Sequence, residues 1–100
     1  MVENFILRPL AVQDMQEGFD WYETQSPGLG AEFLEEVEAC FQTIRRIPKA
    51  SPPVKKNYRR ALVKRFPYAV FFEYENEAIT VYSVFHTSQN PKKWMKRLGK

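Results

Sequence analysis

The chain has 100 residues, which predicts one domain spanning residues 1–100 with room for a single modest core. Hydrophobic residues make up 44% and aromatic residues 15% of the composition, which argues against a disordered chain. The net charge is only +3, and no apolar run approaches the ~20 residues that cross a bilayer, so we expect no membrane association.

The N-terminal residues have neither a basic segment nor a long apolar run, so we expect no signal peptide and a cytoplasmic protein. Cys40 is the only cysteine, which excludes an internal disulfide framework and a cysteine-based metal site. The sequence also lacks a glycine-rich phosphate loop and a paired-histidine motif. We therefore expect neither a metal nor a cofactor.

A short strand is predicted at residues 5–7, and Pro9 ends it. Apolar residues then recur at helical spacing over residues 11–25 and again over 31–47. Proline and glycine at 27–30 separate these two helices, which we expect to form an antiparallel hairpin. The apolar positions expected to form the core against a sheet are Phe19, Tyr22, Phe33, Val37, Phe41 and Ile44.

Residues 52–57 are predicted to be an extended linker, and three strands follow it. These strands, rich in Val, Phe, Tyr and Ile, are predicted at residues 59–66, 68–74 and 78–86. The connections between them are short, so the strands are expected to form an antiparallel meander.

After the meander, Asn90 as N-cap and Pro91 at the first helical position predict a short C-terminal helix, with Trp94 and Leu98 on its apolar side. The predicted fold class is α+β: an N-terminal strand, a helical hairpin packed on one face of an antiparallel meander, and a short C-terminal helix. The other face of the sheet is expected to be partly open, with basic residues near it.

Charges are distributed unevenly along the chain. There are eight acidic and no basic residues between Ala11 and Glu38, and nine basic and no acidic residues between Arg45 and Arg65. Five more basic residues and no acidic residue follow His86. Such a polarised chain produces a field that attracts a polyanion to one side.

His86 is the only histidine. At a strand end it is either structural or exposed, or it is a proton-transfer group or substrate contact. On a strand over residues 59–66, Arg60 and Lys64 share one face, whereas Arg59 and Arg65 share the other. These cations are candidates for binding phosphate groups. The further candidate contacts for a substrate or partner are Tyr68, Tyr82, Lys92, Lys93 and Arg97.

Three phrases carry a family resemblance: WYETQSPGLGAEFLEEV, RRALVKRFPYAVFFEYE and ITVYSVFHTSQNPKKW. Together they resemble the RelE/ParE superfamily of toxins from bacterial type II toxin–antitoxin and plasmid-stabilisation modules. The resemblance runs from Phe5 to Arg97. It implies a helical hairpin against an antiparallel sheet, and a cognate antitoxin that neutralises the toxin.

The resemblance implies two different targets. ParE-like members inhibit DNA gyrase, whereas RelE-like members cut mRNA in the ribosomal A site without a metal. In a RelE-like protein the catalytic residues would be His86, Arg60, Lys64 and Arg65. Relatives often carry an arginine shortly after the histidine, where this chain has Thr87-Ser88-Gln89. That departure and the FPY phrase favour the ParE-like target. An inactive binding module of the same fold is a third alternative.

Overall fold

The computed structural model describes residues 1–98, without the side chains of Trp94 and Leu98, so the predicted apolar side of the C-terminal helix lies outside the described residues. The elements in chain order are β1 (Asn4–Leu7), α1 (Pro9–Gln25), α2 (Leu29–Arg46), a 3₁₀ turn (Pro48–Ala50), β2 (Pro53–Lys55), β3 (Tyr58–Leu62), β4 (Tyr68–Glu75), β5 (Ala78–His86) and α3 (Pro91–Leu98). No helix in this described part of the chain is both long and apolar enough to cross a membrane.

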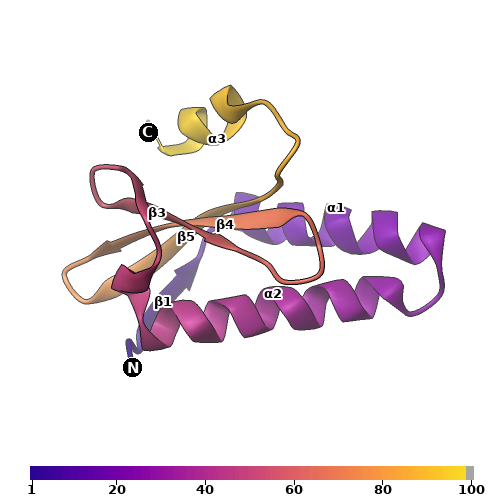
Figure 1. Cartoon of the computed structure of the whole chain (residues 1–100), viewed down its shortest axis with the longest axis horizontal. Coiled ribbons are helices and arrows are strands. Elements are labelled where there is room, and N and C mark those ends of the chain that lie inside the picture. Colours follow the sequence, from indigo (N-terminus) through magenta and orange to yellow (C-terminus); the bar gives the residue numbers. More distant parts are fainter. Residues whose placement is uncertain (99–100) are drawn as a thin grey trace.

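The strands form one five-stranded sheet in the order β1-β5-β4-β3-β2. Helices α1 and α2 lie side by side on one face of the sheet, called here the inner face, and α3 lies on the opposite, outer face (Figure 1). This arrangement confirms the predicted α+β fold. The sheet is mixed rather than purely antiparallel, because β1 runs parallel to β5 and pairs with it from Asn4↔Ala78 to Leu7↔Val81.

The β4–β5 hairpin contains two irregularities. Its turn consists of Asn76 and Glu77, both at positive φ (54° and 59°), as a type I′ turn requires. Further along, Phe71 pairs with Ser83 whereas Phe72 pairs with Val81, so Tyr82 is an extra residue on β5. This β-bulge resets the alternation of side chains, and it places Tyr82 and Ser83 together on the outer face.

The core lies between the inner face and the helical hairpin. One stripe of α2 (Phe33, Val37, Phe41 and Ile44) is buried against alternate residues of β4 and β5, which confirms those four predicted core positions. Tyr22 packs against this core from α1, whereas Phe19 is only half-buried. The helices approach closely at Gly18, where an added Cβ would lie 2.6 Å from the Phe33 ring.

The glutamate Glu23 fixes the connection between the helices. Its two carboxylate oxygens accept hydrogen bonds from the N–H groups of Gly28 (2.9 Å) and Gly30 (3.0 Å). These N–H groups lie at the start of α2, where N–H groups have no partner within the helix. The positive φ of Gly28 (89°) permits the tight turn that brings Glu23 to them.

Two expectations about the region before β4 are wrong. The predicted strand over residues 59–66 ends at Leu62, and Arg65 has a positive φ of 70° that a continuous strand does not permit. Lys64 and Arg65 therefore lie in a loop and do not share strand faces with Arg60 and Arg59. Part of the predicted linker is also a strand, because Pro53–Lys55 forms β2 and pairs with β3.

Candidate functional site

His86 ends β5 opposite Tyr68 of β4, and the two rings meet edge to face with centroids 5.2 Å apart. The backbone N–H of Ser88 donates a hydrogen bond to His86 Nδ1 (3.1 Å), and the Ser88 hydroxyl lies 2.7 Å from the same atom. Because Nδ1 accepts from a backbone N–H, the proton of the neutral ring is on Nε2. The imidazole is thus held in one orientation by its own turn.

A small cleft of about 60 Å³ lies beside His86. Its lining residues are Asp14, Glu17, Gly18, Tyr68, Val84, Phe85, His86 and Gln89. The described lining includes two carboxylates and no Lys or Arg, and its residue after the histidine is the uncharged Gln89. The cleft is therefore poorly suited to hold a phosphodiester during its cleavage, which requires cations for the developing charge.

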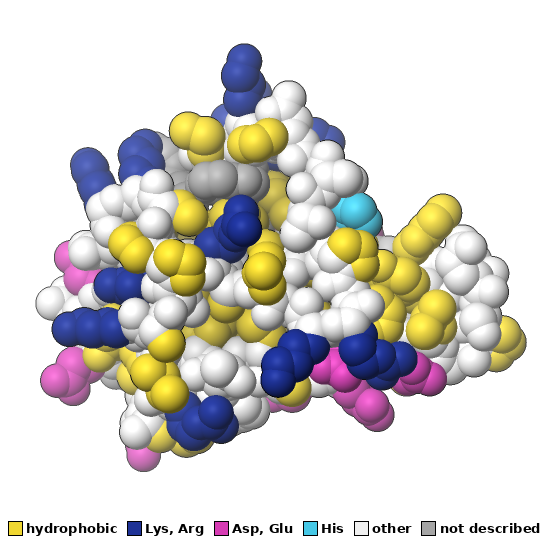
Figure 2. Space-filling model, viewed as in Figure 1, with side chains coloured by type: hydrophobic (Ala, Val, Ile, Leu, Met, Phe, Trp, Pro, Cys, Tyr) yellow, Lys and Arg dark blue, Asp and Glu magenta, His cyan; other side chains and the backbone are white. Residues whose placement is uncertain are grey.

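The structure does not bring the predicted catalytic cations together around His86. Arg65 turns towards α2, where its guanidinium lies 2.7 Å from a carboxylate oxygen of Glu32 and 3.6 Å from one of Glu36. The hydrogen bond that Arg65 donates to Glu32 raises the pKa of Arg65. Figure 2 shows the histidine (cyan) with uncharged side chains between it and the Lys and Arg side chains of the same view.

Arg60 and Lys64 line a different feature, a groove between α2 and β3 of about 420 Å³. We call it the α2–β3 groove. Its described lining consists of Glu36, Ala39, Cys40, Thr43, Ile47, Ala50, Ser51, Pro52, Arg60, Ala61, Leu62 and Lys64. Two large apolar side chains there are exposed to solvent, Ile47 (54%) and Leu62 (60%). The groove thus combines an apolar floor with a mostly basic rim.

The two tyrosines among the candidate contacts for a substrate or partner lie on opposite faces of the sheet. Tyr68 is a core residue, 9% exposed, whose ring contacts Tyr22 and Phe33. Burial raises the pKa of Tyr68 and leaves its ring no open face for a base. Tyr82 lies on the outer face beside Tyr58, with ring centroids 5.5 Å apart.

The Tyr82 hydroxyl donates a hydrogen bond to Glu73 Oε1 (3.2 Å), and partial burial together with the nearby Glu73 charge raises the pKa of Tyr82 to about 12. The guanidinium of Arg8 lies 5.5 Å from the centre of the Tyr82 ring. Arg8, Tyr82 and Lys96 line an open cavity of about 600 Å³ between the start of α1 and α3. Of the two tyrosines, only Tyr82 is placed to contact a partner.

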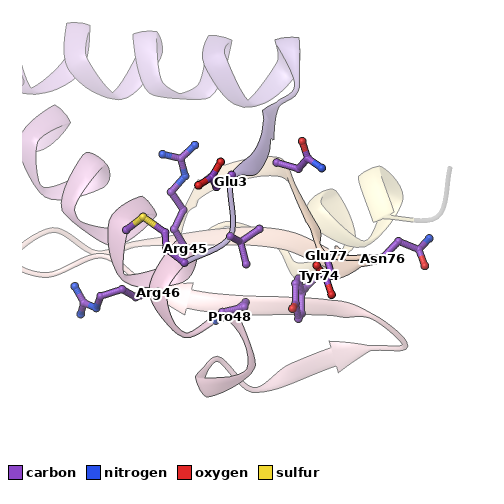
Figure 3. Close-up of a pocket in the computed structure, with 10 residues that line it drawn as sticks. Glu3, Arg45, Arg46, Pro48, Tyr74, Asn76 and Glu77 are labelled. Atoms are coloured by element: carbon purple, nitrogen blue, oxygen red, sulfur yellow. The ribbon is translucent and has the colours of Figure 1, made fainter.

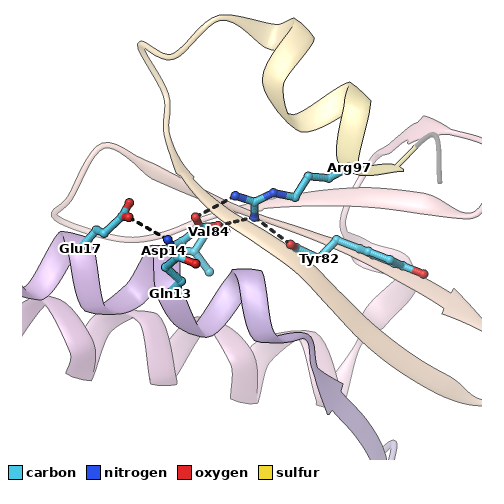
Figure 4. Close-up of polar contacts among 6 residues, drawn as sticks. All are labelled: Gln13, Asp14, Glu17, Tyr82, Val84 and Arg97. Atoms are coloured by element: carbon cyan, nitrogen blue, oxygen red, sulfur yellow. Dashed lines mark hydrogen bonds and ion pairs between the residues drawn. The ribbon is translucent and has the colours of Figure 1, made fainter.

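Lys92 and Lys93 are exposed on α3, as is Lys96. The helix begins as predicted, because Asn90 Oδ1 accepts a hydrogen bond from the N–H of Lys92 (2.9 Å). Arg97 differs from these lysines, since its guanidinium is engaged within the molecule and contacts Asp14 of α1 (Figure 4).

Asp14 is the polar residue that sequence reasoning missed. It is only 8% exposed, and its carboxylate accepts hydrogen bonds from the N–H of Val84 and from Arg97. Its position, three residues after the buried Ala11 on the stripe of α1 that faces the sheet, was the available signal. An acidic residue on an apolar stripe requires a partner, and the sequence does not identify a partner that lies 83 positions away.

A larger cavity of about 910 Å³ lies at the far end of the molecule from His86. It is lined by Arg45 and Arg46 of α2 and, on the other side, by Tyr74, Asn76 and Glu77 of the β4–β5 hairpin (Figure 3). Its described lining includes none of the predicted site residues. Size alone therefore does not mark a functional site in this molecule.

Comparisons with known proteins identify the family of this chain. The sequence model of the family described as "ParE toxin of type II toxin-antitoxin system, parDE" matches residues 5–91. The chain belongs to the ParE toxin family. It is 30% identical over 79 residues to proteins named Toxin ParE2 from two strains of Mycobacterium tuberculosis, CDC 1551 / Oshkosh and H37Rv. Each alignment covers 78% of this chain and 75% of the relative.

The fold is also shared with a solved structure titled "Chromosomal ParDE TA system from P. aeruginosa", with a TM-score of 0.76. That match covers 87% of this chain and 98% of the other, at 12% identity, and shows the fold alone. The segment of this ParE-family chain that the family model matches, residues 5–91, includes Asp14 but ends before Arg97. The contact between Asp14 and α3 thus joins the matched region to residues beyond it.

Proposed function

We propose that this ParE-family toxin acts in the cytoplasm on DNA gyrase, by binding rather than by cutting RNA. The observation that carries the proposal is the separation of His86 from the cations Arg60, Lys64 and Arg65. A ribonuclease without a metal needs a proton-transfer group and cations around one phosphate. A protein that only binds its target has no such requirement.

The surface best suited to contact the target is the outer side of α3, with Lys92, Lys93 and Lys96. These side chains are exposed, and α3 contains no acidic residue. Tyr82 and Arg8 continue this surface on the outer face beside α3. A cationic surface with an accessible aromatic ring is suited to an acidic protein surface or to DNA held by the enzyme.

The test compares two assays on one preparation. Purified protein is added to a gyrase supercoiling assay and, separately, to ribosomes carrying mRNA. We expect supercoiling to be inhibited and the mRNA to remain intact. His86→Ala should inhibit supercoiling as strongly as the unmodified protein. Ribosome-dependent cleavage that falls ~10²-fold or more in His86→Ala would instead identify the RelE-like activity.

We further propose that the cognate antitoxin neutralises the toxin by laying an acidic segment with apolar side chains into the α2–β3 groove. Exposed Ile47 and Leu62 provide apolar contacts there, and Arg60 and Lys64 provide complementary charge. Leu62 also ends β3, and its carbonyl accepts a long hydrogen bond from the Cys40 thiol (3.7 Å) on the side of the groove. A segment that is disordered when free gains such contacts as it folds on the toxin.

Co-expression tests this second part. The neighbouring antitoxin gene should restore growth in cells that express the unmodified toxin but should restore it less in cells that express Lys64→Glu. Lys55→Glu is the matched control, because it makes the same charge change at an exposed residue of β2 that lines neither the α2–β3 groove nor the surface of α3. Equal rescue of the unmodified toxin and Lys64→Glu would place the antitoxin elsewhere.

A further inference from the structure

Within residues 1–98, half of β5 has no neighbouring strand on one side. β1 pairs with β5 only as far as Val81, where the N–H of Arg8 makes the last hydrogen bond to the strand (3.1 Å). Beyond that point β4 is the one described strand beside β5. The next groups on the open edge are the carbonyl of Tyr82 and the N–H of Val84.

Two side chains occupy this open edge. Arg97 Nη1 donates a hydrogen bond to the Tyr82 carbonyl (3.1 Å), and the N–H of Val84 donates one to Asp14 Oδ2 (3.0 Å). In a sheet, an acceptor and a donor two residues apart on one edge bond to the peptide groups of a neighbouring strand. Asp14 thus supplies the acceptor, and Arg97 the donor, that the peptide groups of a neighbouring strand would supply.

The two side chains also bond to each other. Arg97 Nη1 lies 2.7 Å from Asp14 Oδ2, and Arg97 Nη2 lies 3.0 Å from Asp14 Oδ1. Paired bonds of this kind fix the orientation of both groups. Asp14 belongs to α1 on the inner face and Arg97 to α3 on the outer face, so the pair joins the two layers around the edge of the sheet (Figure 4).

Helix α3 has only eight residues, too few to be stable in isolation. Its described contacts to the sheet centre on Arg97, whose guanidinium lies 4.6 Å from the centre of the Phe85 ring besides bonding to Asp14 and Tyr82. Among the described side chains of α3, Arg97 is therefore the one that hydrogen-bonds both to β5 and to α1.

We infer that Asp14 and Arg97 form a positioning pair that takes the place of a strand on the open half of β5 and thereby fixes α3 on the outer face. The pair holds Lys92, Lys93 and Lys96 in a defined orientation. The second half of the inference, that this orientation serves contact with gyrase, rests on the proposed function.

Amide hydrogen exchange of the full-length protein tests the first half. In Asp14→Asn and in Arg97→Gln, the amides of α3 and of Val84 should exchange at least tenfold faster, whereas the amides of β4 should be unchanged. Lys96→Gln is the matched control on the same helix, and its α3 amides should exchange as in the unmodified protein. Unchanged α3 exchange in Arg97→Gln would overturn the inference.

Gyrase inhibition tests the second half on the same preparations. The concentration of Arg97→Gln that halves supercoiling should be at least tenfold higher than that of the unmodified protein. Inhibition equal to that of the unmodified protein, with faster α3 exchange, would overturn the role in positioning the target surface. If the unmodified protein itself leaves gyrase uninhibited, the proposed function fails, and the exchange result still decides the first half. If Asp14→Asn does not fold, Arg97→Gln carries the test, because Arg97 is partly exposed.

Discussion

The inner face of the sheet packs against helices of 17 and 18 residues, whereas the outer face carries one helix of eight. On the inner face, apolar side chains from both helices and four strands form one continuous cluster. Among the described residues of the outer face, the buried apolar cluster is Ala69, Phe71 and Phe85, and Arg97 of α3 forms an ion pair with Asp14.

This difference separates two kinds of stability. Apolar burial depends little on direction and is worth roughly 25 cal/mol per Å², so the inner face supplies most of the free energy of folding. An ion pair with paired hydrogen bonds depends strongly on geometry, so the outer face supplies orientation. Substitutions on the inner face should therefore unfold the protein, whereas those on the outer face should change surface properties within a folded molecule.

The largest expected effect is that of Phe41→Ala on the inner face. Phe41 is 4% exposed, and its ring centroid lies 5.3 Å from that of Phe5 on β1. Truncation should lower the free energy of unfolding by about 3–5 kcal/mol, measured by urea denaturation. The control, Leu62→Ala at an exposed position, should change it by no more than about 0.5 kcal/mol. A Phe41→Ala protein as stable as the unmodified one would contradict the assignment of this ring to the core.

Gly18→Ala should have the next largest effect. The new methyl group would lie 2.6 and 2.7 Å from two carbons of the Phe33 ring, so the helices must separate or the ring must move. Such overpacking costs typically about 1–3 kcal/mol, against a gain of about 1 kcal/mol in helix propensity. Thermal melting should show a net loss. Gln16→Ala, on the exposed side of the same helix, is the control, and an increase in melting temperature for Gly18→Ala would mean that the helices are packed less closely.

Alkaline pH tests the outer face through Tyr82. The phenol keeps its proton in the folded protein up to a pKa of about 12, whereas an unfolded chain loses it near pH ~10. The folded state thus binds more protons between these values, so stability should fall as the pH rises from about 10 towards 12. In Tyr82→Phe this pH dependence should be weaker. When the phenolate absorbance is followed as the pH rises, one tyrosine fewer should ionise near pH 12. An identical absorbance titration would contradict the raised pKa of Tyr82.

The smallest effect on the free energy of unfolding is expected for Arg65→Ala. Arg65 lies in the loop before β4 and forms ion pairs with α2. Arg65 and Glu32 have exposed side chains (55% and 48%), so water and salt screen their attraction. A double-mutant cycle with Glu32→Gln should give a small coupling that decreases with added salt. A larger coupling that does not respond to salt would show that the loop depends on this pair for its position.

The elements set by local sequence could be predicted closely. The apolar stripe of α2 and the cap at Asn90 follow from residues within a few positions of one another, and β5 was predicted with its observed bounds, Ala78–His86. The prediction failed at residues 63–66, because Val63 and Phe66 continue an apolar pattern although Arg65 has a positive φ. Contacts of Arg65 with α2, more than 25 positions earlier, accompany this turn, and a local pattern does not contain them.

The candidate site was less predictable than the fold. Sequence identified His86 and the basic residues as types but could not show that Arg65 is paired with α2 or that Tyr68 is buried in the core. The pair formed by Asp14 and Arg97 could not be predicted from the sequence, because it depends on two helices that meet around an edge of the sheet. Such contacts are decided by tertiary packing, which residue spacing does not encode.

The position of β1 has a consequence for how the protein is made. Its only strand neighbour is β5, and Asn4 pairs with Ala78, 74 positions later (78 − 4). During synthesis the first strand therefore has no place to dock until the last strand has left the ribosome. Contacts between such distant residues slow folding, because the intervening chain must be ordered first. A chain that ends before residue 86 cannot complete the sheet. Every activity that needs this fold therefore requires synthesis beyond residue 86.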